Sequence, residues 1–203
     1  MNEIILIGAG GHARSCIDVI ELTGLYKIVG LIEKDKQNLE QSMFYPILGT
    51  DDDLEILRKK FCYALVTLGQ IKSPTTRKRL FKHLQELGYH LPYIISPRAY
   101  VSKNAKIGDG TIVLHDSIVN ANAKVGQNCI INNKVLIEHD VIVGDHCHIA
   151  TGAILNGGVV VGSGSFIGSG VVTKQSISVG NNCIVGAGVV LKNNIRSNEV
   201  IAN

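Results

Sequence analysis

The sequence predicts two domains of different architecture that meet near Pro97: a small α/β domain with a parallel sheet over residues 1–97, and a coil of short β-strands over residues 98–203. Two observations support this division. All four prolines and eight of the ten aromatic residues lie before residue 98, whereas 14 of the 22 glycines lie after it. From residue 101 to residue 191, an aliphatic residue also recurs at every sixth position, with one exception. A fixed short period of this kind indicates a repeat architecture.

The first 95 residues alternate between short apolar runs and segments with one apolar helical face. Ser73 and Pro74 are typical of a helix N-cap and of the first helical position, and Gly88 is expected to end that helix. Strands that alternate with helices predict a parallel sheet covered on both faces. The expected strands span residues 4–7, 28–32 and 63–68, and the expected helices span 13–22, 54–60 and 74–87.

The second half is expected to form a triangular coil with 18 residues in each turn. The residues two places before the aliphatic positions are small or medium in size, as a tight corner requires, and glycine follows the aliphatic residue in every third repeat, at 108, 126, 144, 162 and 180. Turns would stack at roughly 4.8 Å, the spacing of neighbouring strands. The interior is then too narrow for large aromatic side chains. Cys129 and Cys147, one turn apart, are therefore interpreted as stacked core residues and not as a redox pair.

Composition argues against several functional classes. A net charge of +3, with no dense basic block among aromatic residues, disfavours a nucleic-acid partner. No apolar run approaches the roughly 18 to 20 residues of a membrane-spanning helix, and the start MNEIILIGAG lacks the basic region of a secretory signal, so we expect a cytoplasmic protein. Five cysteines without a CxxC pair disfavour a zinc ribbon or a disulfide framework, and we expect no metal site.

Among the four histidines of the coil, His139 has the most suggestive surroundings. Ile137 should face the interior, so that His139 points outward from a corner between Glu138 and Asp140. A carboxylate beside an imidazole fixes its tautomer and raises its basicity, which suits a general base. Gly157 lies 18 residues further on, one turn above, where its N–H could donate to an oxyanion. An ordinary corner glycine explains Gly157 equally well.

A glycine-rich loop connects the first expected strand to the first expected helix. Its sequence is Gly8-Ala9-Gly10-Gly11-His12, and such glycines let backbone N–H groups approach a phosphate at the positive end of a helix. Glu33, at the end of the second strand, would face a ribose. Because a dinucleotide-binding fold needs about six strands and only three or four fit before Pro97, an NAD-dependent enzyme is disfavoured. We expect a half-size domain that binds one nucleotide diphosphate.

A second candidate loop covers residues 68–74 at the carboxyl end of the third strand and contains Gly69. Ligands of open α/β sheets bind at these strand ends. The basic residues that follow, Arg77, Lys78 and Arg79, are explained at least as well by a solvated helix face as by ligand binding.

The pairing of GAGGHA with a coil that carries IEHD and GDHCHI resembles the bacterial hexapeptide-repeat sugar acetyltransferases over almost the whole chain. This family includes the sialic acid O-acetyltransferases and the UDP-4-amino-sugar N-acetyltransferases of bacillosamine synthesis. The resemblance implies a small Rossmann-like parallel-sheet domain followed by a left-handed parallel β-helix. It also implies acetyl-CoA as cosubstrate, a nucleotide-linked sugar as acceptor, and a homotrimer with acetyl-CoA between neighbouring coils.

The resemblance also assigns roles to residues of the coil. It implies that His139 is the general base with Asp140 as its acidic partner, that His148 contacts the acetyl donor or the substrate, and that the N–H of Gly157 binds the thioester carbonyl.

In the first domain, Gly10, Gly11 and His12 would hold the nucleotide sugar, with Glu33 near its base or ribose. Two departures affect the CoA groove: Gln175-Ser176 stands where a Pro-Asn corner is usual, and the chain ends at Ala202-Asn203 before the usual GxPA segment. We therefore expect either a truncated chain or a more open donor site.

These observations favour an N-acetyltransferase that acts on the amino group of a nucleotide-linked sugar in surface glycan synthesis. Two alternatives remain open on the sequence: O-acetylation of a sialic-acid-type hydroxyl, and a non-catalytic trimer that only binds a nucleotide sugar.

Overall fold

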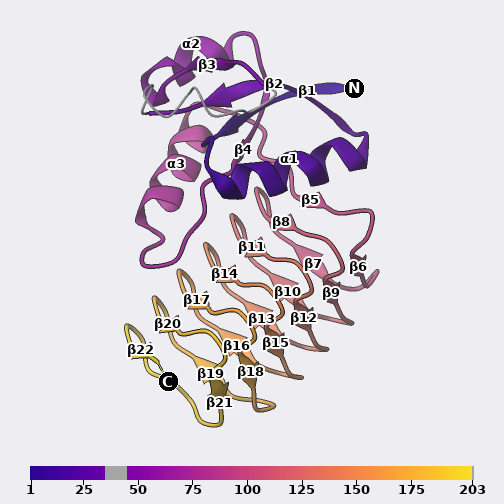
Figure 1. The fold of residues 1–203 in the computed structure, drawn as a ribbon, viewed down its shortest axis with the longest axis vertical. Coiled ribbons are helices and arrows are strands. Elements are labelled where there is room, and N and C mark those ends of the chain that lie inside the picture. Colours follow the sequence, from indigo (N-terminus) through magenta and orange to yellow (C-terminus); the bar gives the residue numbers. More distant parts are fainter. Residues whose placement is uncertain (35–44, 203) are drawn as a thin grey trace.

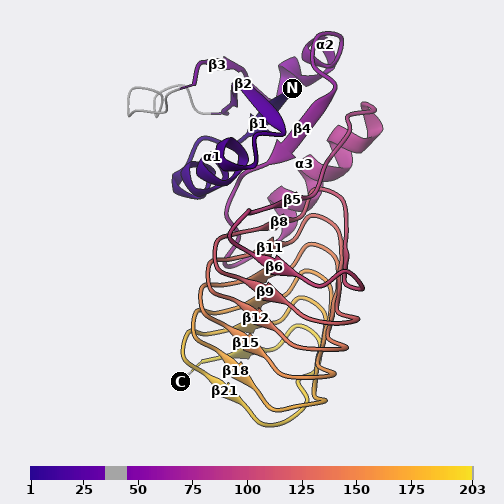
Figure 2. The same cartoon turned by 90° about the vertical axis from the view of Figure 1, so that its right-hand side faces the viewer.

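The computed structural model describes residues 1–34 and 45–202, so the expectation about the chain end at Asn203 lies outside the described residues. Both expected architectures are present. The N-terminal domain sits at one end of a triangular prism whose turns stack toward the C-terminus, and the side views of Figures 1 and 2 show the turns in register. Among the described residues, no helix is long and apolar enough to cross a membrane.

The N-terminal domain contains a four-stranded parallel sheet in the order β3-β2-β1-β4. Alternate residues of β1 pack in opposite directions: Ile4 and Leu6 pack against α1, and Ile5 and Ile7 against α2 and α3. The sheet is thus covered on both faces, as predicted. The elements are β1 (Asn2–Ile7), α1 (Gly11–Thr23), β2 (Tyr26–Ile32), β3 (Ile47–Gly49), the 3-10 helix η2 (Asp51–Asp53), α2 (Leu54–Arg58), β4 (Tyr63–Val66) and α3 (Thr75–Glu86).

Several elements differ from the expected ones: β1, α1 and β2 begin two residues earlier, and β4 ends two residues earlier, at Val66. Strand β3 was not expected, since a three-residue strand carries too short a pattern to be recognised. Helix α2 ends at Arg58 and is preceded by η2, whose Asp53 carboxylate accepts the N–H of Thr50 at 2.8 Å. Helix α3 begins one residue later than expected, at Thr75, whose N–H donates to Ser73 Oγ at 3.2 Å.

The prism is a left-handed parallel β-helix with three sheets, in which strands 18 residues apart are neighbours, as Lys124 and Ile142 are. The domain-facing sheet contains β5 (Ile94–Ile95), β8 (Ile112–Val113), β11 (Ile130–Ile131), β14 (His148–Ile149), β17 (Phe166–Ile167), β20 (Ile184–Val185) and β22 (Val200–Ile201). The apolar-faced sheet contains β6 (Tyr100–Val101), β9 (Ile118–Val119), β12 (Leu136–Ile137), β15 (Ile154–Leu155), β18 (Val172–Thr173) and β21 (Val190–Leu191). The third sheet contains β7 (Lys106–Ile107), β10 (Lys124–Val125), β13 (Ile142–Val143), β16 (Val160–Val161) and β19 (Ser178–Val179).

The aliphatic column fills the prism, and the corners between sheets form three further columns. From residue 110 to residue 188, every sixth residue has a positive φ, a conformation that glycine, asparagine and aspartate adopt at least cost. The glycines that recur every third repeat serve another purpose: a β-carbon at Gly108 would lie 2.6 Å from the backbone N of Gln127 in the next turn. Cys129 and Cys147 are buried and stacked, with the Cys147 N–H donating to Cys129 Sγ at 3.4 Å, which confirms their interpretation as core residues.

The N-terminal domain packs on the domain-facing sheet through α1 at one edge and α3 at the other. Asp18 of α1 meets His115 at 2.7 Å between Oδ2 and Nε2. On the α3 side, a β-carbon at Gly110 would lie 2.5 Å from Phe81, which shows how tightly this corner packs. The first strand of the prism, β5, precedes the expected boundary between residues 97 and 98.

Candidate functional site

His139 lies on the corner between β12 and β13, on the edge shared by the apolar-faced sheet and the third sheet. Ile137 is fully buried, while 55% of the His139 side chain is exposed, as the sequence predicted. Its Nδ1 lies 2.9 Å from Asp140 Oδ2, and this hydrogen bond, together with one from Asn122, lowers the pKa of the Asp140 carboxyl. Because a carboxylate only accepts, Nδ1 carries the proton and Nε2 keeps its lone pair.

Gly157 stacks directly on His139, one turn further along the prism. A β-carbon at Gly157 would lie 2.6 Å from His139 Nε2 and 2.7 Å from Cε1, so any side chain at position 157 would displace the imidazole. The 18-residue arithmetic of the sequence thus identifies a real contact. Gly158, and not Gly157, has the positive φ of this corner.

The N–H of Gly157 has no acceptor among the described residues, unlike its equivalents in the same corner column. One and two turns earlier, the side chain of the preceding residue accepts this N–H: Glu138 for His139 and Asn120 for Ala121. The preceding residue of Gly157 is Asn156, whose side-chain amide donates to the carbonyl of Thr173. The N–H of Gly157 is therefore not used within the described part of the chain.

Thr173 is the one polar residue of the aliphatic column, and its place in the structure explains the exception. It is buried, and its Oγ1 accepts the backbone N–H of Asn156 at 3.0 Å. Thr173 therefore holds both the backbone and the side chain of Asn156. The sequence marks the position of Thr173 by the break in the aliphatic period, but it does not indicate this role.

A second site lies where the N-terminus of α1 and the loop after β4 meet the prism. A cavity of about 570 Å³ opens there, and it brings together Gly11, His12, Gly69 and His148, which the sequence singled out from three separate segments. A β-carbon at Gly10 or Gly11 would meet nothing within 4 Å, so the loop backbone is open to a ligand. Two further lining residues, Gln70 and Ile71, belong to the candidate loop 68–74. The remaining ones, for which the sequence carries no signal, are Ser15, Asn132, Asn133 and Thr151.

This cavity of about 570 Å³ is called the acceptor cavity from here on, and its two histidines, His12 and His148, are neutral at physiological pH. His148 Nδ1 donates to the Gln70 carbonyl and its Nε2 faces the Asn132 amide at 3.2 Å. Burial lowers the pKa of His148 to about 4. Burial, and then the charges of Arg77 and His148, lower the pKa of His12 to about 3.

Arg77 is neither a solvated residue nor a residue of the acceptor cavity. It is only 1% exposed, and its guanidinium donates to the carbonyls of Val66 and Leu68 and to Asn128 of the prism. This buried cation therefore holds the end of β4 and its loop against the β-helix. Lys78 and Arg79, in contrast, are exposed.

Glu33 lies apart from the acceptor cavity. Its carboxylate accepts the N–H groups of Ala9 and Lys34, each at 2.9 Å, and so braces the glycine-rich loop. It lines a small cavity of about 90 Å³ next to Lys34 and Arg79.

The acceptor cavity and His139 are on different edges of the prism in one chain. The cavity lies on the domain-facing sheet and on its shared edge with the apolar-faced sheet, at Asn133 and Thr151. The His139 edge lies opposite the domain-facing sheet in the triangular cross-section. The two edges are joined by the apolar-faced sheet.

Models of protein families match both halves of the chain. The model described as PglD N-terminal domain matches residues 3–84, that of the bacterial transferase hexapeptide (six repeats) matches 122–157, and that of the hexapeptide repeat of succinyl-transferase matches 158–193. Among solved structures, the acetyltransferase domain of PglB from Neisseria gonorrhoeae FA1090, in complex with acetyl coenzyme A, superposes with a TM-score of 0.92 at 28% identity, covering 100% of this chain and 96% of that one. The chain thus combines a PglD N-terminal domain with transferase hexapeptide repeats and is closely similar in structure to bacterial sugar acetyltransferases.

Two further solved structures show the same similarity. PerB from Caulobacter crescentus, in complex with CoA and GDP-perosamine, gives a TM-score of 0.91 at 27% identity, covering 98% of this chain and 93% of that one. WeeI from Acinetobacter baumannii AYE, at 20% identity and a TM-score of 0.81 over 100% of this chain and 98% of that one, shares the fold. No curated protein sequence matches the chain significantly. In this hexapeptide-repeat acetyltransferase, the matched repeats contain both His139 and Gly157.

Proposed function

We propose that this acetyltransferase transfers the acetyl group of acetyl-CoA to the amino group of a nucleotide-linked amino sugar. The observation that carries the proposal is the stacking of His139 on Gly157, with a free Nε2 lone pair beside an unpaired backbone N–H. PerB, which one solved structure describes as a perosamine N-acetyltransferase, binds CoA and GDP-perosamine. Two structures of that enzyme carry asparagine or alanine in place of one histidine, which fits a central role for a histidine in this family.

The residues support direct transfer without a covalent enzyme intermediate. The amine nitrogen bonds to the thioester carbonyl carbon while His139 Nε2 accepts the amine proton, and Asp140 stabilises the imidazolium that forms. The N–H of Gly157 donates to the oxyanion. When the C–S bond breaks, the carbonyl is restored as an amide, and the departing thiolate takes the proton from the His139 imidazolium and leaves as CoA.

The acceptor cavity supports the assignment of the nucleotide part. The open backbone at Gly10 and Gly11 and the N-terminus of α1 suit a diphosphate. Neutral His12 suits an uncharged hydroxyl group of a sugar, whereas both ring nitrogens of His148 are already bonded to Gln70 and Asn132, so that His148 shapes the cavity wall.

A three-fold assembly would join the two sites. The apolar-faced sheet presents an outward column without a charged residue: Tyr100, Ile118, Leu136, Ile154, Val172 and Val190, of which Tyr100, Ile118 and Val190 are 61%, 41% and 58% exposed. If this sheet faces a three-fold axis, the His139 edge of one chain meets the acceptor-cavity edge of the next. The proposed homotrimer thus places each active site between two chains.

The decisive experiment measures thiol release from acetyl-CoA with UDP- and GDP-linked 4-amino sugars, with the matching 4-hydroxy sugars and a sialic acid as acceptors. We expect turnover with the amine only, lost in His139→Ala. Turnover with a hydroxyl would replace the amine assignment. Absence of turnover with every acceptor, accompanied by a thermal shift with nucleotide and none with CoA, would instead favour a binding protein.

A further inference from the structure

A second large cleft lies on the opposite side of the N-terminal domain from the acceptor cavity. It has a volume of about 660 Å³ and lies between α3 and the corner column shared by the third sheet and the domain-facing sheet. A β-carbon at Gly164 would lie 3.2 Å from Pro74 Cγ, so the two domains nearly touch at one end of it. The polar lining residues that could bind a ligand are Lys78, Lys82, His146, Ser163, Asn181 and Asn182.

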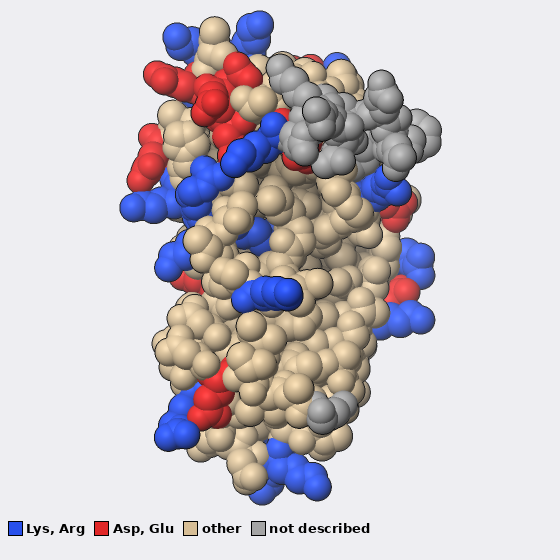
Figure 3. Space-filling model, turned by 60° about the vertical axis from the view of Figure 1, so that its left-hand side comes forward, with Lys and Arg blue, Asp and Glu red and all other residues tan. Residues whose placement is uncertain are grey.

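The cleft is positively charged. Lys78, Arg79 and Lys82 line it, and none of its described lining residues is an aspartate or a glutamate. Arg79 pairs with Asp51 at 2.9 Å and Lys82 approaches Glu86 at 3.6 Å, while Lys78 has no ion-pair partner among the described residues. On the face seen in Figure 3, basic side chains gather where the N-terminal domain meets the prism.

His146 contributes a donor whose orientation is fixed by a chain of hydrogen bonds. The Arg77 guanidinium, which can only donate, bonds to Asn128 Oδ1 at 2.8 Å. Asn128 Nδ2 is therefore the group that donates to His146 Nδ1 at 2.9 Å. The proton of neutral His146 is thus on Nε2, which has no acceptor among the described residues, although the side chain is only 9% exposed.

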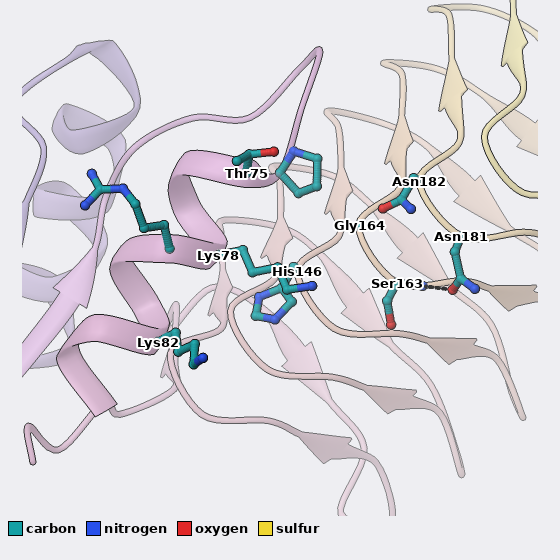
Figure 4. A pocket seen from close by; sticks show the side chains of 10 residues that line it. Thr75, Lys78, Lys82, His146, Ser163, Gly164, Asn181 and Asn182 are labelled. Atoms are coloured by element: carbon teal, nitrogen blue, oxygen red, sulfur yellow. Dashed lines mark hydrogen bonds between the residues drawn. The ribbon is translucent and has the colours of Figure 1, made fainter. Parts of the chain in front are cut away.

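The far wall of the cleft offers further donors. Ser163 Oγ accepts the N–H of Asp145 at 3.1 Å, so its own hydroxyl hydrogen remains available. Figure 4 shows Lys78 extending toward His146, with Ser163, Asn181 and Asn182 on the turns beyond. Two ammonium groups, an oriented imidazole N–H and a hydroxyl are the donor types that bind phosphate oxygens.

We propose that this cleft is a second anion site, which binds a phosphate-bearing small molecule between α3 and the His146 corner. Its volume is in the range of small-molecule sites, about 300–1,000 Å³, and exceeds the need of a single phosphate. The phosphate belongs either to a free phosphorylated metabolite or to the 3′-phosphate of CoA. This site is separate from the acceptor cavity, and binding to it does not depend on acetyl transfer.

Calorimetric titration of the full chain with pyrophosphate, CoA and dephospho-CoA tests the proposal. The test variant is Lys78→Gln/Lys82→Gln, and the matched control is Lys59→Gln/Lys60→Gln, which removes the same charge from exposed positions outside the cleft. We expect pyrophosphate affinity to fall about tenfold or more in the test variant and less than about twofold in the control. Unchanged melting temperatures would show that both variants fold.

The two sources of the phosphate give different results. If it belongs to CoA, the test variant weakens CoA but not dephospho-CoA; if it belongs to a metabolite, both coenzymes bind as in the wild type while pyrophosphate weakens. Pyrophosphate binding that the test variant leaves unchanged would belong to the acceptor cavity and would overturn the proposal. Equal losses in test and control variants would do the same, since they would reflect net charge alone.

Discussion

The imidazole of His139 occupies the space that a side chain at position 157 would need: a β-carbon added to Gly157 would lie 2.6 Å from His139 Nε2. Gly157→Ala should therefore displace the imidazole. The variant retains the backbone N–H at position 157, and the local backbone conformation should not change, because Gly157 does not have a positive φ. Misplacement on this scale costs roughly 10²-fold in rate, so we expect kcat to fall by about that factor with little change in melting temperature.

A double-mutant cycle checks the cause of this loss. In a His139→Ala background, the added Gly157→Ala has no imidazole to displace and should change kcat little further. Equal losses from Gly157→Ala with and without His139 would refute the steric explanation.

Thr173→Val should affect catalysis through Asn156. Without the hydroxyl, the N–H of Asn156 loses its acceptor, so the backbone that carries the N–H of Gly157 is held less firmly, although the Thr173 carbonyl still accepts the Asn156 side chain. We expect kcat to fall by up to about 10²-fold, the range measured for lost oxyanion donors, and stability to fall by about 1–3 kcal/mol.

Thr111→Val is the matched control for this variant. Thr111 is also fully buried and its hydroxyl bonds backbone groups of Gly126 and Cys129, away from the His139 edge. A similar loss of stability with normal kcat is expected. If both variants lose kcat alike, Thr173 has only a general structural role.

Subunit mixing tests whether each active site is shared between chains. His139→Ala removes the base, and Gly11→Glu places a carboxylate in the acceptor cavity, where it repels a diphosphate. Each variant alone should be inactive.

Co-expression of the two variants with different tags should recover about a quarter of wild-type activity. In a random trimer, about a quarter of the interfaces combine an intact His139 from one chain with an intact Gly11 from the next. No recovery, with mixed trimers isolated by both tags, would place the whole site within one chain.

The neutral histidines of the acceptor cavity make stability depend on pH. The pKa of His12 is about 3 and that of His148 about 4 in the folded chain, below the ordinary value of 6.5. Below pH 6.5 the histidines of the unfolded chain bind protons that those of the folded chain do not. Their contribution to the free energy of unfolding is therefore fully present above pH 6.5 and is lost progressively as the pH falls toward 4. Each histidine contributes up to about 1.4 kcal/mol per pH unit.

Urea unfolding at pH 7.5 and pH 5.0 measures this loss. We expect His148→Gln to reduce the difference in unfolding free energy between the two pH values. The same pH dependence in wild type and His148→Gln would contradict the burial of a neutral imidazole at this position.

The prism was predictable because its signal is periodic. One aliphatic residue in six defines the coil, and the 18-residue turn then places Gly157 on His139 without further information. The column of positive φ also has a sequence signal, since glycine, asparagine or aspartate occupies most of its positions, but it was not recognised.

Contacts between the domains were not predictable in the same way. The period is identical on all three sheets, so it does not indicate which sheet the N-terminal domain covers, and Asn133 and Thr151 could not be assigned to a cavity. Arg77 stands in a run of basic residues that is typical of a solvated face. It is buried because the carbonyls at the end of β4 and Asn128 of the prism converge on it, and Asn128 lies 51 residues away in sequence.

The regular spacing of the corners restricts how the length of this chain can change. An insertion of 18 residues between Asp140 and Asn156 would add one turn and leave every later residue on its own edge, but it would move Gly157 about 4.8 Å further from His139. An insertion of six residues would rotate everything beyond it by one side of the triangle. Homologues that keep this chemistry should therefore vary in length outside residues 139–157, in steps of whole turns.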